Sequence, residues 1–276
     1  MSVIFPGGFN RMTQNDCFLV PWMIVGLAMA MLGSAEAIEG NPALPRLEES
    51  ITFYASFDQS TTDAELANGA PTGHPGEPNA ASPEFSNGVF LKGLETPNGG
   101  TYWGSEGNID LTKSGGIAFW VSPRGWADRE LQYIFLLRLL TPNGQLMVGR
   151  MDLRPQGKST PSIYVYAAVE SDSVSEPIHG TGQWEDGEWH LVAVNWTDSE
   201  VQLSVDGAPF VKTPFKGFLK NGAGAGRLML GCGWTDGQEG LFAADEVMAV
   251  DRPFSDEEIA KLKAEGMAQT ERAGKP

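Results

Sequence analysis

The sequence predicts an all-β fold, a two-sheet antiparallel jelly-roll sandwich with one short C-terminal helix. Two observations lead to this prediction. Apolar and polar residues alternate with a period of two in many short runs, which is typical of half-buried strands. The chain also has 34 glycines and 18 prolines among its 276 residues, so turn-forming residues separate these runs throughout. Many short strands with almost no helix favour a sandwich whose core lies between two sheets.

The strands can be placed in order along the chain. The alternation is clearest at 51–57 and 117–122, and further strands are expected at 88–92, 131–139, 145–153, 162–169, 189–197, 200–206, 226–232 and 241–250. Turn residues at 142–144 and 197–199 separate two pairs of these strands, so each pair is expected to form an antiparallel hairpin. Residues 59–84, rich in Ala, Gly, Pro, Asn and Thr, are expected to form an extended surface loop.

One helix is expected after the last strand. Ser255 can cap it, Glu258 completes a capping box, and Ile259 and Leu262 form a short apolar stripe for docking. No repeat and no internal linker interrupts the preceding strands, so residues 50–266 are expected to form one domain. Residues 267–276 are expected to form a flexible tail.

The N-terminus is expected to direct export. An uncharged apolar run at 17–32 is followed by Ala35 and Ala37, which form an A-x-A cleavage site, so residues 1–37 are expected to be a signal peptide. The run is shorter than the roughly 20 apolar residues of a membrane span. We therefore expect a secreted or periplasmic protein that is not an integral membrane protein after cleavage. The alternative is a protein that stays anchored in the membrane by the uncleaved segment. Residues 38–49 are expected to be a linker.

Charge and cysteine content limit the possible functions. The formal net charge is −16 and no run of Lys or Arg occurs, which excludes a generic nucleic-acid binder because phosphate groups require clustered positive charge. Only Cys232 remains after cleavage, so the mature chain has no internal disulfide, and Cys232 is expected to be a small core residue. Stability must therefore come from a large apolar core.

Four segments carry a resemblance to a known family. They are ITFYASFDQSTTDAELANG at 51–69, GGIAFWVSP at 115–123, WHLVAVNWTDSEVQLSVDG at 189–207 and LFAADEVMAVDRPFSDEEIAKL at 241–262. Together they resemble a laminin-G-like domain of the concanavalin A-like lectin/glucanase superfamily, over about residues 51–263. The resemblance implies a jelly roll. This superfamily includes sugar-binding lectins, protein-binding modules, glycoside hydrolases and passive spacers, so the fold alone does not settle function.

The resemblance also implies a structural calcium ion. Similar domains use acidic positions near the end of the first strand and the start of the last one, which correspond here to Asp58 and Asp245, with Asp63 and Glu246 as further candidates. Calcium takes six to eight oxygen ligands, so it needs several such acids brought together by the fold. The alternative is that Asp58 caps a turn, while Asp245 and Glu246 are solvated or hydrogen-bonded to nearby backbone.

Aromatic residues beside glycines at strand ends are the candidate carbohydrate contacts. Loops at such positions can present an aromatic ring to the apolar face of a pyranose, with polar side chains addressing the hydroxyl groups. These candidates are Tyr102, Trp103, Trp126, Trp184 and Trp234. The tryptophans inside strands are expected to be core residues.

The sequence does not predict an enzyme. Laminarinase-type relatives place their catalytic acids as Glu-x-Asp-x-Glu on a strand. The nearest match, Glu170, Asp172 and Glu176, is longer and falls where a strand runs out into Pro177, so a solvated hairpin tip is the better interpretation. His190 lies inside a strand, where a hydrogen-bonded role is expected rather than that of a general base.

These observations predict an exported, non-catalytic recognition module that binds carbohydrate. The alternative is a protein-interaction or structural cell-envelope module without a small-molecule site, whose partner would be an extracytoplasmic protein. A distant alternative is a glycoside hydrolase or lyase that uses Glu170 and Asp172.

Overall fold

A computed structural model describes residues 41–42, 44–76, 82–96, 100–126, 133–142, 144–152, 161–169, 173–174, 178–215, 226–231 and 241–273. The chain divides into two compact units, residues 1–38 and 39–276, and every described residue belongs to the second unit. The expected signal peptide, Cys232 and Trp234 lie outside the described residues. Within the described ranges, no helix combines the length and the apolar character needed to cross a bilayer.

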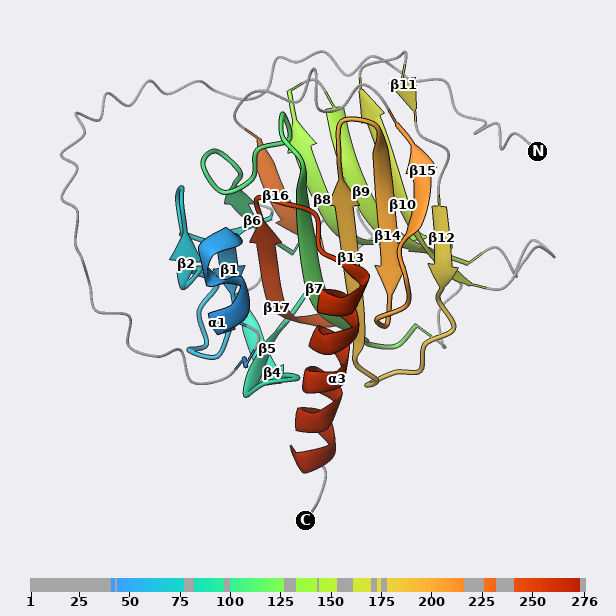
Figure 1. Ribbon diagram of the computed structural model, residues 1–276. Helices are drawn as coiled ribbons and strands as arrows, with labels where there is room; N and C mark the ends of the chain where they lie inside the picture. The colour runs from blue at the N-terminus through green and yellow to red at the C-terminus, as the bar shows by residue number, and fades with distance from the viewer. Residues whose placement is uncertain are drawn as a thin grey trace, which may run out of the picture. The chain divides into compact units, whose positions relative to one another are not determined.

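The described strands form two antiparallel sheets, as predicted (Figure 1). Sheet A has nine strands among the described residues. Its spatial order is β15 (Val211–Pro214), β14 (Glu200–Val205), β13 (His190–Trp196), β7 (Gly115–Pro123), β17 (Phe242–Val250), β1 (Ile51–Ala55) and β2 (Leu66–Ala67). In addition, β5 (Lys92–Glu95) pairs with β17, and β4 (Glu84–Asn87) pairs with β5.

Sheet B has eight strands within the described residues. Its spatial order is β11 (Ser173–Val174), β10 (Ser162–Val169), β9 (Gly144–Met151), β8 (Tyr133–Thr141), β16 (Arg227–Leu230), β6 (Thr101–Gly104) and β3 (His74–Pro75). The eighth strand, β12 (Ile178–Thr181), pairs with β10. The hairpins predicted for β8 with β9 and for β13 with β14 are both confirmed.

The main core lies between the two sheets. Alternate residues of sheet A, such as Phe119 and Val192, face alternate residues of sheet B, such as Leu137 and Val148, and all four side chains are fully buried. This arrangement follows from the period-two pattern, because successive side chains of a strand point to opposite faces of its sheet.

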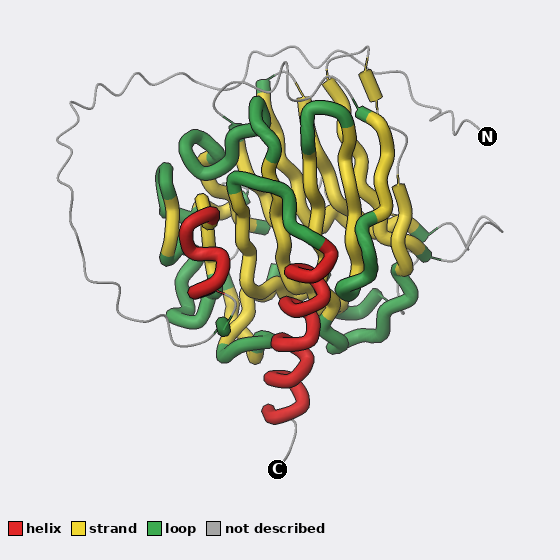
Figure 2. The backbone as a smooth tube through the Cα atoms, viewed as in Figure 1, coloured by secondary structure: helices red, strands yellow, loops and turns green. Residues whose placement is uncertain are grey.

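The outer face of sheet A is covered by helix α3 (Asp256–Ala273), which lies across β7 and β13 in Figures 1 and 2. Ile259 and Leu262 of this helix pack in one apolar cluster with Trp120 and Met248 of the sheet. Both faces of β7 and β17 are therefore buried. At Gly266 the helix approaches the sheet closely, since a Cβ atom there would lie 2.2 Å from the ring of Trp120.

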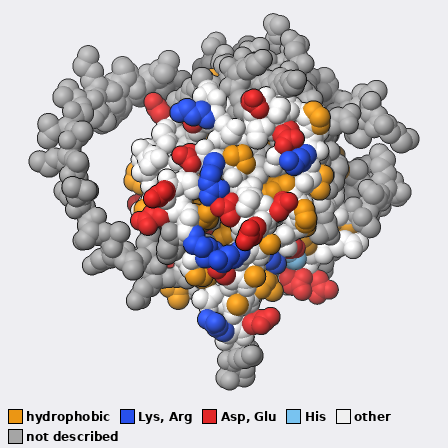
Figure 3. All heavy atoms as spheres, viewed as in Figure 1, with side chains coloured by type: hydrophobic (Ala, Val, Ile, Leu, Met, Phe, Trp, Pro, Cys, Tyr) orange, Lys and Arg blue, Asp and Glu red, His pale blue; other side chains and the backbone are white. Residues whose placement is uncertain are grey.

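Ion pairs surround this helix on the surface. Arg252 binds Glu258 at 2.7 Å, Lys263 binds Asp206 at 2.5 Å, and Arg46 binds Glu265 at 2.8 Å. On this side of the molecule, Lys and Arg side chains are interspersed with Asp and Glu (Figure 3). The predicted capping box is confirmed, because Ser255 Oγ accepts from the Glu258 N–H while Glu258 Oε2 accepts from the Ser255 N–H.

The expected boundaries of the domain need correction at both ends. Part of the expected linker forms helix α1 (Leu44–Leu47) and the 3-10 turn η1 (Glu48–Ser50), and the side chains of Leu44 and Leu47 are buried. The folded unit therefore starts before residue 50. The C-terminal helix is longer than expected, so that residues 267–273 belong to it and not to a flexible tail.

Two local predictions about strands were wrong. Residues 88–91 form the turn between β4 and β5, where the Gly88 N–H donates to Leu91 O, instead of lying in a strand. The region 59–84, expected to be a loop, contains β2 and β3 and contributes Glu84 to β4. These strands are two to four residues long, too short to produce a visible alternation.

Candidate functional site

Three of the predicted carbohydrate contacts are core residues. Trp103 is fully buried and its Nε1 donates to Thr62 O at 2.8 Å. Trp126 is 2% exposed and its Nε1 donates to Leu241 O at 2.6 Å, while Trp184 is 9% exposed. The expectation that loops present these three rings to solvent is therefore wrong. Adjacent glycines permit close packing of a large ring as readily as its exposure.

His190 belongs to the same buried group. Its ring stacks on Trp184 with centroids 4.2 Å apart, and Trp184 stacks on Trp126 at 5.8 Å. His190 Nδ1 lies 2.8 Å from Asp206 Oδ2. The expected hydrogen-bonded strand histidine is thus confirmed.

The acids proposed as calcium ligands occupy two different places. Asp245 is fully buried: its Oδ2 accepts from the N–H groups of Val89 and Phe90, at 2.7 and 3.1 Å, and its Oδ1 accepts from the Glu246 N–H. Gly88 permits this approach, because a Cβ atom there would lie 2.4 Å from Asp245 Oδ2. Asp63 is exposed and accepts from the Gly73 N–H in a surface loop.

Glu246 is the second buried acid of this region. It is 3% exposed, has a positive φ of 54°, and lies at a β-bulge in β17. Its Oε2 accepts from Tyr54 Oη at 2.8 Å and from Asn41 Nδ2, while its Oε1 has no hydrogen-bond partner among the described residues. Burial raises the pKa of Glu246 to about 8, and the negative charges of Asp58 and Glu65 act in the same direction.

This arrangement does not fit a calcium cage. Both oxygens of Asp245 are occupied by backbone N–H groups, and Asp58 Oδ1 accepts from the Lys92 N–H at 3.1 Å. In the part of the chain that the structure describes, no three Asp, Glu, His or Cys side chains are placed to hold a metal ion together. The alternative in which Asp245 and Glu246 are hydrogen-bonded residues fits this geometry better. Calcium binding stays a prediction from the family resemblance.

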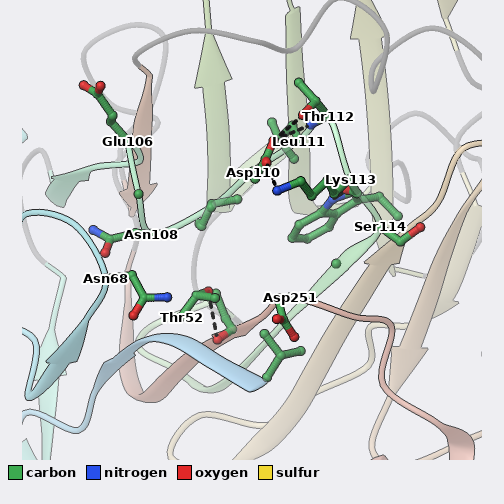
Figure 4. A pocket seen from close by; sticks show the side chains of 16 residues that line it. Thr52, Asn68, Glu106, Asn108, Asp110, Leu111, Thr112, Lys113, Ser114 and Asp251 are labelled. Carbon is green, nitrogen blue, oxygen red and sulfur yellow. Dashed lines mark hydrogen bonds and ion pairs between the residues drawn. The ribbon is translucent and has the colours of Figure 1, made fainter. Parts of the chain in front are cut away.

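A surface pocket of about 560 Å³ lies where the loop before β7 meets the ends of β1 and β17. Its lining includes Thr52 of β1, Asn68 after β2 and Asp251 after β17. Asp110 and Lys113 line it from the loop before β7 (Figure 4). Asp110 accepts from Thr112 and pairs with Lys113 at 3.2 Å. Trp196, the aromatic residue of the lining, is 2% exposed and its Nε1 donates to Lys113 O. The pocket therefore offers polar groups but no ring face for a sugar.

The outer face of sheet B, unlike the pocket, carries aromatic rings. The described helices pack on sheet A and not on this face. Strand register places one row of side chains across six strands, in the order His74, Tyr102, Met229, Arg138, Met147 and Tyr166. Neighbouring strands lie about 4.8 Å apart, so five spacings give the row a length of about 24 Å. Tyr102 and Tyr166 are half-buried, which leaves part of each ring accessible.

The middle of this face is a small apolar cluster. Phe135, Met147 and Tyr164 are 6–7% exposed and pack with Met151 and Tyr166. Burial raises the pKa of the Tyr164 hydroxyl, so Tyr164 remains neutral at physiological pH. The cluster itself exposes little surface, and Tyr166 at its edge is half-buried.

Polar groups lie beside the tyrosines. The guanidinium carbon of Arg227 lies 4.5 Å from the centre of the Tyr102 ring, and the His74 ring lies 5.2 Å from the same ring. Arg138 Nη2 donates to Gln145 Oε1 at 3.2 Å. This face thus combines aromatic surface with hydrogen-bond donors and acceptors.

No acidic side chain occurs among the described residues that alternation places on this face. These residues are His74, Tyr102, Tyr133, Phe135, Arg138, Leu140, Gln145, Met147, Met151, Ser162, Tyr164, Tyr166, Ala168, Arg227 and Met229. The predicted contact Tyr102 is one of them, whereas Tyr166 and Arg227 were missed. The period-two pattern of β10 already placed Tyr164 and Tyr166 on one face, but only the register brings Tyr102 and Arg227 to that face. Glu170, Asp172 and Glu176 lie outside the described residues.

Comparison with solved structures supports the fold assignment. Domain 4 of AbnA, an extracellular GH43 arabinanase from Geobacillus stearothermophilus solved with arabinotriose, matches with a TM-score of 0.50 and 16% identity, over 78% of this chain and 99% of that one. The binding domain of botulinum neurotoxin DC in complex with SialylT matches with a TM-score of 0.60 and 10% identity, over 80% of this chain and 52% of that one. The binding domain of Paraclostridial Mosquitocidal Protein 1 matches with a TM-score of 0.59 and 11% identity, over 79% of this chain and 52% of that one.

This chain therefore spans about half the length of the toxin binding domains. The neighbours are mostly binding domains, with a domain of a glycoside hydrolase among them. Among curated proteins, no relative of this chain is found. A laminin G family model described as concanavalin A-like lectin/glucanases superfamily matches residues 96–260, more than half of the sequence. The chain therefore belongs to this laminin G family of the concanavalin A-like lectin/glucanases superfamily.

Proposed function

We propose that this domain recognises carbohydrate, without cleaving it, on the outer face of sheet B. The observation that carries the proposal is the row of side chains across six strands, with the half-buried rings of Tyr102 and Tyr166 near its two ends. Aromatic rings pack against the apolar faces of sugars, while Arg138 and Gln145 between them can address hydroxyl groups.

The charge of the face supports binding in preference to hydrolysis. Glycoside hydrolases of the retaining and inverting types use a pair of carboxyl groups on either side of the scissile bond. The described residues of this face include no Asp or Glu. The arabinanase domain was solved with arabinotriose and the binding domain of botulinum neurotoxin DC with SialylT, which makes a glycan the natural first class of ligand to test.

We further propose that the domain acts after export, on the basis of the apolar run at 17–32 and the A-x-A site that follows it. Its ligand would then be an extracytoplasmic glycan.

A glycan array followed by titration calorimetry tests this function. Tyr102→Ala and Tyr166→Ala should each weaken binding of the best ligand about tenfold, since each removes one ring contact. Leu91→Ala is the matched control, because Leu91 is 67% exposed and lies in the turn between β4 and β5 of sheet A. Unchanged affinity in both tyrosine variants would refute the site. It would favour the alternative of a protein-interaction module.

A further inference from the structure

The outer face of sheet B differs in charge from the rest of this acidic protein. The chain has 35 acidic and 19 basic residues, a formal net charge of −16. The described residues of this face nevertheless include two arginines, Arg138 and Arg227, and no acid. An exposed cation such as Arg227, on a face without described acids, favours a ligand of negative charge at that place.

Arg227 is the cation best placed to meet a ligand. It is exposed, it begins β16, and its guanidinium group lies over the ring of Tyr102. A planar guanidinium presents donors in a fork that matches a carboxylate or a sulfate, and its position over the ring restricts its motion. No ion pair joins Arg227 to a carboxylate within the described residues.

The cations on the other side of the molecule are arranged differently. Arg46, Arg252 and Lys263 all lie within 3 Å of a carboxylate oxygen. Their charges are largely neutralised locally. Arg227 differs from them, because it lies over a tyrosine ring and no described residue of its face is acidic.

We propose that the glycan bound by this face is an anionic chain that carries carboxylate or sulfate groups, with sugar rings on Tyr102 and Tyr166 and an acidic group at Arg227. This inference rests on the proposed function. The row's length of about 24 Å, from five strand spacings, suits an extended chain that crosses the strands. Because the formal net charge is −16, general electrostatic attraction to a polyanion is not expected, so a local contact such as that of Arg227 is needed.

Two pairs of polymers test the inference with the full-length protein. Polygalacturonate is compared with its methyl-esterified form, and dextran sulfate with dextran, so that each pair differs in charge but not in its sugar backbone. At least one anionic member should bind at least about tenfold more tightly than its neutral counterpart, the effect of one charge-assisted hydrogen bond. Added salt should weaken binding of that member.

Variants locate the effect. Arg227→Gln should remove most of the preference for the anionic polymer, and Arg227→Lys should retain part of it, because lysine keeps the charge but not the fork. Lys261→Gln is the control, since Lys261 is exposed on α3 and its loss changes the net charge equally. It should leave the preference unchanged.

The outcomes separate this inference from the proposed function. If the neutral member of a pair binds as tightly as the anionic one and Tyr102→Ala still weakens binding about tenfold, the inference is wrong and the proposed function stands. A preference for the anionic polymer that persists in Arg227→Gln also overturns the inference, because the acidic group then binds elsewhere. If neither anionic polymer binds, the inference fails, and the glycan array alone decides on the proposed function.

Discussion

The guanidinium carbon of Arg227 lies 4.5 Å from the centre of the Tyr102 ring, and the two residues lie on adjacent strands of sheet B. This contact brings a cation and an aromatic ring together on a sheet face that no described helix covers. On sheet A the corresponding outer face is occupied by α3. Among the described residues, the two sheets therefore differ: α3 packs on the outer face of sheet A, and no described helix packs on the outer face of sheet B.

The close approach of α3 to sheet A predicts that Gly266→Ala destabilises the protein. A Cβ atom at this position would lie 2.2 Å from the Trp120 ring, and such overpacking costs about 1–3 kcal/mol. The gain in helix propensity from Gly to Ala is at most about 1 kcal/mol, so the steric effect should prevail. Urea unfolding measures the difference. Ala264→Val, on the exposed side of the helix, should cost less than about 0.7 kcal/mol, and equal losses in both variants would contradict this packing.

Asp206, in the turn after β14, is expected to contribute to the free energy of unfolding in a pH-dependent way. Burial alone would raise the pKa of Asp206, but hydrogen bonds from His190 and Lys263 lower it below its usual value. The ionised form thus stabilises the fold above the unfolded pKa of about 3.9, and this contribution is lost as the pH falls through the lowered pKa. Asp206→Asn should destabilise the protein by about 1–3 kcal/mol at pH 7. The difference between variant and wild type should shrink in strong acid, as followed by urea titrations at several pH values. A difference independent of pH would contradict this role.

Glu246 is expected to give stability the opposite dependence on pH. Its pKa is raised to about 8 by burial, so the folded state favours the protonated form. Its contribution to stability is fully present below the unfolded pKa of about 4.3 and is lost as the pH rises through about 8. In the presence of a chelator, wild-type stability should fall relative to Glu246→Gln across this window, by at most about 1.4 kcal/mol per pH unit. If the free energies of unfolding of the two proteins follow parallel curves against pH, Glu246 is not protonated in the folded state.

The same two proteins test the calcium prediction. An ion bound at Asp58, Asp245 and Glu246 would require ionised carboxylates, and it would raise the melting temperature of the wild type in proportion to the logarithm of its concentration. The hydrogen bonds of Asp245 to backbone predict instead no change on adding calcium or removing it. If calcium raises the melting temperature of the wild type by several degrees and does not change that of Glu246→Gln, the site is established and this expectation is contradicted.

The sequence was sufficient to predict the fold because long strands carry their own signal. The alternation in β10 predicted its bounds, 162–169, without error. The predicted bounds of β13 and β17 differ from the observed ones by at most one residue at each end. Strands of two to four residues, such as β3 and β6, contain too few alternations to be recognised. The helix was predicted by its capping box, while its length was underestimated because the apolar stripe of Ile259 and Leu262 is short. The close contact of Gly266 with Trp120 lies beyond that stripe.

The candidate site was harder to predict because it depends on register. Trp103 and Tyr102 are neighbours in the sequence, but alternation sends one into the core and the other to the outer face. Tyr102, Arg227 and Tyr166 come together only through pairings between strands that lie far apart in the chain. Composition and motifs do not specify these pairings.

The affinity of the double variant Tyr102→Ala/Tyr166→Ala for the best glycan tests the central claim most directly. The two rings are about 19 Å apart, since four strand spacings of about 4.8 Å separate them, so their effects should add to about a hundredfold loss. This loss is predicted for a folded variant with a lower melting temperature, because Tyr166 packs against the apolar cluster and Tyr102 against Arg227. Glycan affinity equal to that of the wild type, in a variant that is still folded at the assay temperature, would contradict recognition on the outer face of sheet B.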